Sequence, residues 1–212
     1  MTTIHLIHKQ LTQWHTHRQP YHYEGGMSSW DTHHTTEVPP LIEQLDGADK
    51  RPAELDQAGG TFGSRPAANL EALDTLIHID NEAAAWVRKL GHDDPGTTIA
   101  CIRKLYSLAA SAKFCNKEKP TIEDREAVCC DVHRIERDMR RWWTQARIVS
   151  GWDSLPWRPN NTCPVCSERR SLRIRPDDRA AFCVGCRETW DQGTIGLLAE
   201  HVRAENGDEP VS

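Results

Sequence analysis

The most regular hydrophobic pattern in the chain lies between residues 128 and 146, where apolar side chains recur at alternating steps of four and three. This spacing places them on one face of a helix and predicts packing against other helices. Residues 120–124 (PTIED) resemble a helix start, because Asp124 follows Thr121 by three positions. The apolar seam consists of Val128, Val132, Ile135, Met139, Trp142 and Ala146.

Two further helices are predicted before this seam. Residues 67–90 carry two adjoining apolar stripes, and Gly91 supplies a helix stop. A second helix begins at Thr97 or Thr98, since either is a good N-cap. Three helices joined by short loops predict a mainly α fold, with a small antiparallel bundle over residues 67–150. The apolar positions are Leu70, Leu73, Ile77, Ala84 and Val87, then Leu76, Ile79, Ala83, Trp86 and Leu90, and in the second helix Ile99, Ile102, Leu105 and Ala109.

The two ends of the chain carry weaker patterns. Residues 1–20 predict an N-terminal amphipathic helix, with Ile4, Ile7, Leu11 and Trp14 at helical spacing. Glycine, proline and serine punctuate residues 21–66, which are expected to form a mostly irregular linker in which only PLIEQLDGA gives a helical turn or two. Residues 191–212 predict a closing C-terminal helix followed by an acidic tail.

Two Cys-x-x-Cys pairs, CPVC and CVGC, lie 16 residues apart within residues 151–190. The residues between them alternate, turn at 176–178 and return, which predicts a β-hairpin that brings the pairs together. Four thiolates in this pattern are typical of zinc, so the sequence predicts a zinc ribbon with one structural Zn²⁺ ion. Four protein ligands leave no position for water, which argues against catalytic zinc. The predicted ligands are Cys163, Cys166, Cys183 and Cys186.

Other uses of the thiols and histidines stay open. A redox disulfide is the main competitor to zinc, although no βαβ context surrounds either pair, and iron is a lesser one. Cys129 and His133 lie one helical turn apart, and Cys101 or Cys115 would complete a second metal site with them. A histidine-rich N-terminal segment is a further metal candidate, read more simply as a biased segment. Its members are His5, His8, His15, His17, His22, His33 and His34.

Charge does not single out a partner. The net charge is −5, which lacks the basic excess that many nucleic-acid binders show. All seven lysines lie in residues 1–120, whereas the fourteen cations after them are arginines, mixed with sixteen acids. These arginines either contact phosphate through their bidentate fork or pair with the neighbouring acids on a solvated surface. The candidate nucleic-acid contacts are Arg170, Arg173, Arg175 and Arg179 in the hairpin, and Arg134, Arg137 and Arg141 on the third bundle helix.

No nucleophile elbow, phosphate-binding loop, dinucleotide fingerprint or zinc-protease motif is present, so we expect no enzyme and no small-molecule substrate. The N-terminus lacks the continuous apolar stretch of a signal peptide, and no run reaches membrane-spanning length. A cytoplasmic location is therefore expected. Four tryptophans near the junction of bundle and hairpin are expected to pack in the core or between domains, with base stacking as the alternative; they are Trp142, Trp143, Trp152 and Trp157.

From about Ser64 to Ala204 the chain resembles zinc-ribbon proteins encoded by actinobacterial phages and related genomes. The resemblance rests on GSRPAANLEALD, on RRWWTQARIVSGW, and on CPVC and CVGC followed closely by a tryptophan. It implies a ribbon embedded in helices and little about activity, since members are often labelled only as DNA-binding or hypothetical proteins; a phage-encoded chain would lie in the host cytoplasm.

These observations predict a non-enzymatic zinc-ribbon protein that binds nucleic acid, with DNA the expected form, in a phage-type regulatory or replication-associated role. The alternative is a protein-protein interaction adaptor with a purely structural zinc ion. A redox- or metal-responsive switch is a third hypothesis.

Overall fold

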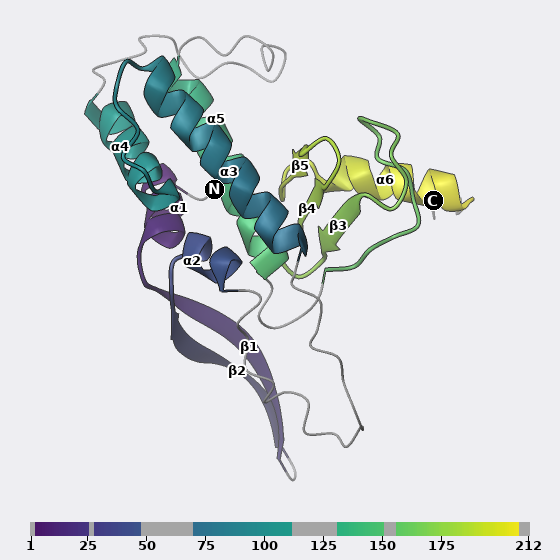
Figure 1. The fold of residues 1–212 in the computed structure, drawn as a ribbon. Coiled ribbons are helices and arrows are strands. Elements are labelled where there is room, and N and C mark those ends of the chain that lie inside the picture. The colour runs from purple at the N-terminus through teal and green to yellow at the C-terminus, as the bar shows by residue number, and fades with distance from the viewer. Residues whose placement is uncertain (1–2, 26–27, 48–69, 112–130, 151–155, 208–212) are drawn as a thin grey trace, which may run out of the picture.

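The computed structural model describes residues 3–25, 28–47, 70–111, 131–150 and 156–207, and these residues form six helices and two small antiparallel sheets (Figure 1). None of the helices among them is long and apolar enough to cross a membrane. The helices are α1 (Ile4–Thr12), α2 (Leu41–Asp46), α3 (Leu70–Lys89), α4 (Thr98–Ser111), α5 (Asp131–Ser150) and α6 (Ile195–Asn206). The strands are β1 (His15–Gly25), β2 (Ser28–Val38), β3 (Leu172–Arg175), β4 (Ala180–Cys183) and β5 (Thr189–Trp190).

Helix α5 lies at the centre of the molecule, in contact with α1 to α4 on one side and with the three-stranded sheet at its C-terminal end. The predicted seam is confirmed from Ile135 onward: Ile135, Met139, Trp142 and Ala146 are all buried, whereas Val132 is half-buried. Val128 and the predicted helix start at 120–124 lie outside the described residues. Burial of these large side chains accounts for the packing of the other helices around α5.

The N-terminal segments belong to the same core, which the sequence did not predict. Ile7 and Leu11 of α1 and Leu41 and Leu45 of α2 are buried in one cluster with the bundle helices. Helix α2 confirms the helical turns expected in PLIEQLDGA. Residues 15–38 pair as a hairpin, where the sequence predicted the end of a helix up to residue 20 and an irregular linker from residue 21. We call α1 to α5 the helical body.

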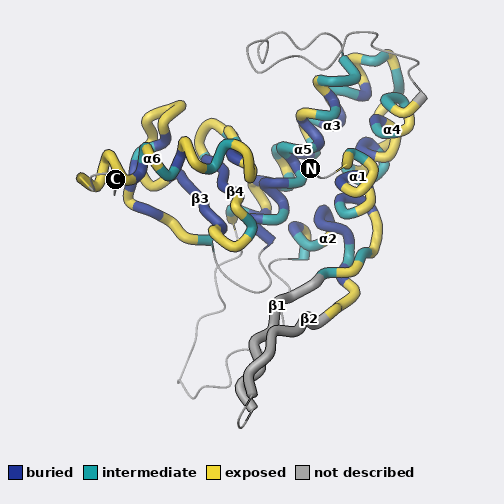
Figure 2. The backbone as a smooth tube through the Cα atoms, turned by 180° about the vertical axis from the view of Figure 1, so that it is seen from behind, coloured by how far each residue is buried: buried dark blue, intermediate teal, exposed yellow. Residues whose placement is uncertain are grey.

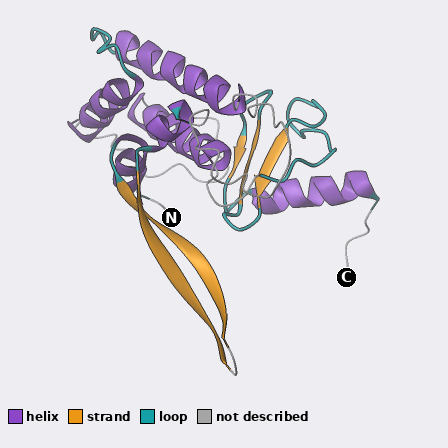
Figure 3. Ribbon diagram, turned by 60° about the horizontal axis from the view of Figure 1, so that its bottom comes forward, coloured by secondary structure: helices purple, strands orange, loops and turns teal. Residues whose placement is uncertain are grey.

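The hairpin of β1 and β2 extends away from the helices (Figures 1 and 3). Its strands pair in antiparallel register from His15 opposite Val38 to Gly25 opposite Ser28. Cross-strand hydrogen bonds between backbone groups hold such a ribbon, and they leave no signature in the side-chain pattern. For that reason, periodicity did not reveal these strands.

Helix α3 presents a different face to the core at its N-terminal half than the sequence predicted. Its stop at Gly91 is confirmed by a φ of 78°, a conformation that favours glycine. Its N-terminal half, however, exposes the predicted stripe, with Leu70, Leu73 and Ile77 exposed by 68%, 48% and 51%. The inward positions are instead Ala72, Thr75 and Ile79, all fully buried, of which Ile79 belongs to the second predicted stripe.

The three-stranded sheet has the order β3-β4-β5 and lies between the helical body and α6 (Figure 2). The predicted hairpin is confirmed, and β5 adds a third strand. Alternation on β4 divides the sheet's two faces: Phe182 joins the core of the helical body, whereas Cys183 joins a second cluster with Leu198 and Val202 of α6. Helix α6 confirms the predicted closing helix and ends at Gly207. We call residues 156–207 the cysteine module.

Candidate metal centre and its attachment to the helices

Four cysteine sulfurs meet at one end of the cysteine module. The Sγ atoms of Cys163, Cys166, Cys183 and Cys186 lie within 4.8 Å of one another, the one such cluster among the described residues. The Cys163–Cys186 and Cys166–Cys183 sulfur separations are 3.8 Å and 3.7 Å. A tetrahedral ion with metal–sulfur bonds of about 2.3 Å, the length typical of zinc, separates its sulfurs by about 3.8 Å. The four thiols therefore fit a four-coordinate metal ion.

The first cysteine pair forms a tight turn. The amide of Ser167 donates to the carbonyl of Cys163 at 2.8 Å, and the amide of Cys163 donates to the carbonyl of Glu168 at 3.0 Å. Ser167 adopts a φ of 61°, so the chain reverses directly after Cys166. The amide of Val165 donates to Cys163 Sγ at 3.4 Å. Amides that point at sulfur stabilise a thiolate, which is the form that binds metal.

The second cysteine pair repeats this turn. The amide of Arg187 donates to the carbonyl of Cys183 at 3.0 Å, and the amide of Cys183 donates to the carbonyl of Glu188 at 2.9 Å. Arg187 takes a φ of 63° directly after Cys186, as Ser167 does after the first pair. Two turns with matching hydrogen bonds thus face each other across the sulfur cluster.

The buried position of the thiols makes their ionisation costly unless a cation is bound. Burial raises the pKa of the Cys163 and Cys186 thiols. Burial opposes ionisation of Cys183 as well, but hydrogen bonds to Ser171 and to the amides of Cys186 and Gly185 outweigh it and lower the pKa of that thiol. A divalent metal ion offsets the cost of holding four thiolates together, since its charge favours the deprotonated form of each ligand.

Arg173, a predicted phosphate contact, is buried against the helical body. Its side chain is 9% exposed, and its Nε and Nη2 donate to the two carboxylate oxygens of Glu71 on α3 at 2.9 Å and 2.5 Å. Its Nη1 donates to the carbonyls of Arg170 and Leu172, both at 2.9 Å. Burial alone would raise the pKa of Glu71, but the hydrogen bond and charge of Arg173 outweigh it and lower that pKa. Arg173 therefore joins the cysteine module to α3 and is largely withdrawn from solvent.

Arg175, another predicted phosphate contact, joins the module to α5. It is buried, and its Nη1 donates to the carbonyl of Arg147 at 3.2 Å. Asp178 lies beside it and accepts a 2.5 Å hydrogen bond from Arg147 Nη2. The turn between β3 and β4 is thereby fixed to the last turns of α5.

Arg187, which follows the last cysteine, makes a third connection. Its guanidinium contacts the carboxylate of Asp74, and its Nη1 donates to Thr75 Oγ1 at 3.2 Å. Its carbonyl accepts a 2.9 Å hydrogen bond from Gln145, a buried residue of α5. The sequence did not predict that residues of α3 pair with Arg173 and Arg187. The signal that could have revealed these partners is the spacing of polar positions 71, 74 and 75 on one face of a helix that is expected to pack in a core.

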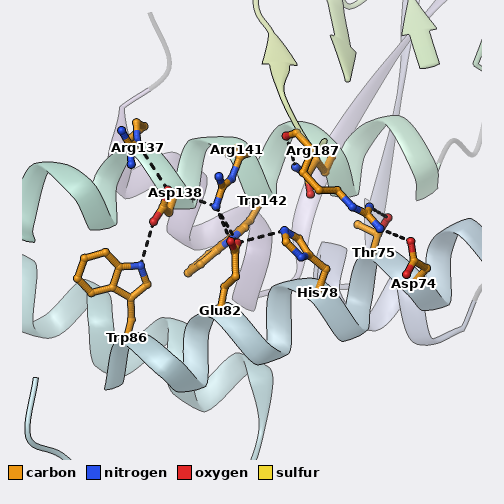
Figure 4. Close-up of polar contacts among 11 residues, drawn as sticks. Asp74, Thr75, His78, Glu82, Trp86, Arg137, Asp138, Arg141, Trp142 and Arg187 are labelled. Atoms are coloured by element: carbon orange, nitrogen blue, oxygen red, sulfur yellow. Dashed lines mark hydrogen bonds and ion pairs between the residues drawn. The ribbon is translucent and has the colours of Figure 1, made fainter. Parts of the chain in front are cut away.

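Arg141, a predicted nucleic-acid contact on the third bundle helix, pairs with α3 instead. It donates to both carboxylate oxygens of Glu82 on α3, at 2.7 Å and 2.8 Å (Figure 4). Trp142 Nε1 donates to the same carboxylate at 2.7 Å, and His78 Nε2 lies 3.3 Å from it. Burial would raise the pKa of Glu82, but the hydrogen bonds from His78 and Trp142 and the charge of Arg141 lower it to about 2. This network stabilises the α3–α5 interface.

The other four candidate arginines are exposed. Arg134 and Arg137 lie on α5, where Arg137 Nε is 3.6 Å from the carboxylate of its neighbour Asp138. Arg170 and Arg179 lie in the cysteine module with φ values of 63° and 47°. The seven predicted arginines therefore fall into an inner group that holds the molecule together (Arg141, Arg173, Arg175) and an outer group at the surface (Arg134, Arg137, Arg170, Arg179).

The second metal site considered from sequence lies only partly within the described residues, which exclude Cys115 and Cys129. Cys101 is buried, and its Sγ lies 3.5 Å from a carboxylate oxygen of Asp94. Burial, together with that carboxylate, raises the pKa of Cys101 to about 11, so the thiol stays protonated. Two of the N-terminal histidines serve packing: His8 stacks on Tyr106 with ring centroids 4.0 Å apart, and His5 Nδ1 lies 3.0 Å from the Tyr106 hydroxyl.

These features define a class of protein: a mainly helical body that carries a small module with a four-cysteine cluster able to hold a metal ion. Residues 4–148 match the family described as a domain of unknown function, DUF7341, and the chain belongs to that family. The match runs from α1 into the last turn of α5 and stops before the four cysteines of the sulfur cluster. Neither a search of curated proteins nor a search of solved structures finds a match. This family match does not link the chain to phages or to zinc-ribbon proteins, so the resemblance expected from the sequence stays a prediction.

Proposed function

We propose that the chain is a non-enzymatic, zinc-stabilised protein that binds nucleic acid, with DNA the expected form. The observation that carries the zinc assignment is the pair of matching turns around Cys163–Cys166 and Cys183–Cys186, with sulfur separations suited to tetrahedral Zn²⁺. Because four protein sulfurs complete the coordination, the ion supplies folding energy and no reactive position. The residues from 156 to 190 then form the zinc ribbon that the sequence predicts.

The division of the arginines supports the nucleic-acid assignment. Arg173 and Arg175 fix the module on the helices and Arg141 joins α5 to α3, so that the module and α5 present their exposed cations from one connected framework. The outer group (Arg134, Arg137, Arg170, Arg179) supplies guanidinium forks suited to phosphate. A regulatory or replication-associated role follows from the resemblance and remains part of the proposal.

The salt dependence of DNA binding tests this function. Fluorescence anisotropy with a labelled DNA duplex and a labelled single strand would give the dissociation constant from about 50 to 200 mM salt. Four phosphate contacts on duplex DNA predict a log–log slope of about −3.6, which is an affinity loss of about 150-fold over this range. Replacing all four outer arginines should flatten the slope. The variant carries glutamine at positions 134 and 137 on α5, and asparagine at positions 170 and 179, where the backbone is left-handed. Arg203→Gln on α6 is the matched single-charge control. Absence of binding at the lowest salt contradicts the proposal.

A protein-interaction adaptor is the second candidate. The observation that favours it is the exposed apolar stripe of Leu70, Leu73 and Ile77 on α3, three successive positions along one helix face. If neither DNA nor RNA binds at low salt, this reading takes precedence.

A further inference from the structure

A cleft of about 620 Å³ lies between the helical body and the cysteine module, beside the contacts that join them. Its walls come from α5, from the turn between β3 and β4, and from the segment between β5 and α6, while Ile7 of α1 contributes an apolar wall. This volume falls in the range of small-molecule and nucleotide sites. None of the seven arginines predicted from sequence lines it except Arg179.

Three arginines line the cleft, and two of them share one face of α5. Arg140 and Arg147 lie two helical turns apart on that face, and Arg179 approaches from the β3–β4 turn. Two carboxylates also line the cleft and are already engaged. Asp178 accepts from Arg147 at 2.5 Å. Asp191 accepts from the amide of Gly193 at 3.0 Å and lies 3.1 Å from Thr194 Oγ1. The cations outnumber the acids by three to two, so the cleft favours an anion.

An aromatic platform lies beside these cations. The guanidinium of Arg147 sits 4.5 Å from the ring centroid of Trp143. Trp143 is held in place because its Nε1 donates to Gln10 Oε1 on α1 at 2.6 Å. Stacked tryptophan and guanidinium groups are surfaces on which an unpaired base stacks, and neighbouring arginines suit the phosphate attached to it.

We infer that this cleft binds one nucleotide of a single-stranded nucleic acid, with a phosphate at Arg140 and Arg179 and the base on the stack of Trp143 and Arg147. The inference rests on the proposed function and names the site and the form of nucleic acid. A single strand fits better than a duplex, because the cleft is concave and a base reaches Trp143 only when it is unstacked.

Matched pairs of variants test the site. Arg140→Gln with Arg179→Asn removes two charges from the cleft. Arg134→Gln with Arg170→Asn removes the same charges from the same two parts of the molecule, outside the cleft. Asparagine is used at positions 170 and 179 because it tolerates the left-handed backbone found there. The probes are labelled (dT)12 and a 12-base-pair duplex, in about 50 mM salt, with anisotropy as the readout.

The cleft pair should weaken (dT)12 binding at least tenfold more than the control pair, while the two pairs affect the duplex equally. Trp143→Leu should weaken (dT)12 binding by about tenfold or more, and Trp143→Phe should retain most of it, since phenylalanine still offers a stacking face. Circular dichroism checks that each variant is folded. Equal losses of (dT)12 binding in both pairs overturn the cleft while leaving the proposed function in place. No binding of either probe by the wild-type protein overturns both.

Discussion

The contact between Glu71 and Arg173 gives the sharpest test of how the cysteine module is attached. Glu71→Gln keeps the size and one acceptor oxygen of the side chain but removes its charge. The guanidinium of Arg173 is 9% exposed, so water cannot replace the lost partner. The substitution leaves a nearly buried cation facing a neutral amide.

The size of the effect follows from the geometry. The pair has two charge-assisted hydrogen bonds, of 2.9 Å and 2.5 Å. Bonds to charged groups contribute about 1.5–3 kcal/mol each, and the glutamine retains part of one. Glu71 itself is 24% exposed, which reduces the loss. We expect Glu71→Gln to lower the free energy of unfolding by about 2 kcal/mol.

Asp74→Asn is the matched control, one helical turn away and facing Arg187 of the same module. The carboxylate of Asp74 is 66% exposed, and Arg187, although only 12% exposed, keeps its hydrogen bond to Thr75, so this substitution should cost less than Glu71→Gln, at most about 1 kcal/mol. Urea unfolding followed by far-UV circular dichroism gives both values. Adding Arg173→Met to Glu71→Gln should restore stability, because it removes the unpaired buried charge. A loss for Glu71→Gln no larger than for Asp74→Asn would refute the attachment.

Further predictions concern the helical body and α6. Glu82 has a folded pKa of about 2 against an ordinary 4.5, so its stabilising effect is complete above pH 4.5 and disappears as the pH falls toward 2. Glu82→Gln should therefore cost about 2 kcal/mol at pH 7, after allowance for solvent screening, and almost nothing near pH 2, as measured by urea unfolding at each pH. Met139→Ala, at a fully buried position of α5, should cost about 3 kcal/mol by the same assay. Gly207→Ala, at a φ of 75°, should lower the melting temperature of the zinc-loaded protein, whereas Gly196→Ala, which meets nothing within 4 Å inside α6, should raise or preserve it. Equal shifts for the two glycine variants would contradict the capping role of Gly207.

The parts of the fold that sequence reasoning predicted are those with local causes. The seam around Met139 and Trp142 is a repeat within one helix. The two Cys-x-x-Cys pairs, with alternating residues between them, define a hairpin within about twenty residues of chain. Helix α6 and the stop at Gly91 have short-range signals of the same kind.

The parts that it missed depend on partners far away in the chain. Arg173 and Glu71 are separated by 102 positions, so no local pattern links them. The sequence offered two uses for the arginines, phosphate contact or pairing with acids. The structure uses Arg173, Arg175 and Arg141 for pairing with the chain itself. The same limit explains α3: its leucines follow a helical stripe, but which stripe faces inward depends on the polar partners supplied by α5 and the cysteine module.

The metal content of the purified protein tests the central claim most directly. Elemental analysis by plasma mass spectrometry should find about one zinc ion per wild-type chain. Cys163→Ser should lose that metal and unfold the cysteine module, as read from the amide hydrogen exchange of β3 and β4. Cys101→Ser is the control, because it changes a buried thiol outside the sulfur cluster and should keep the ion. A wild-type chain without metal, or a Cys163→Ser variant with its zinc and its protected strands intact, would contradict the account.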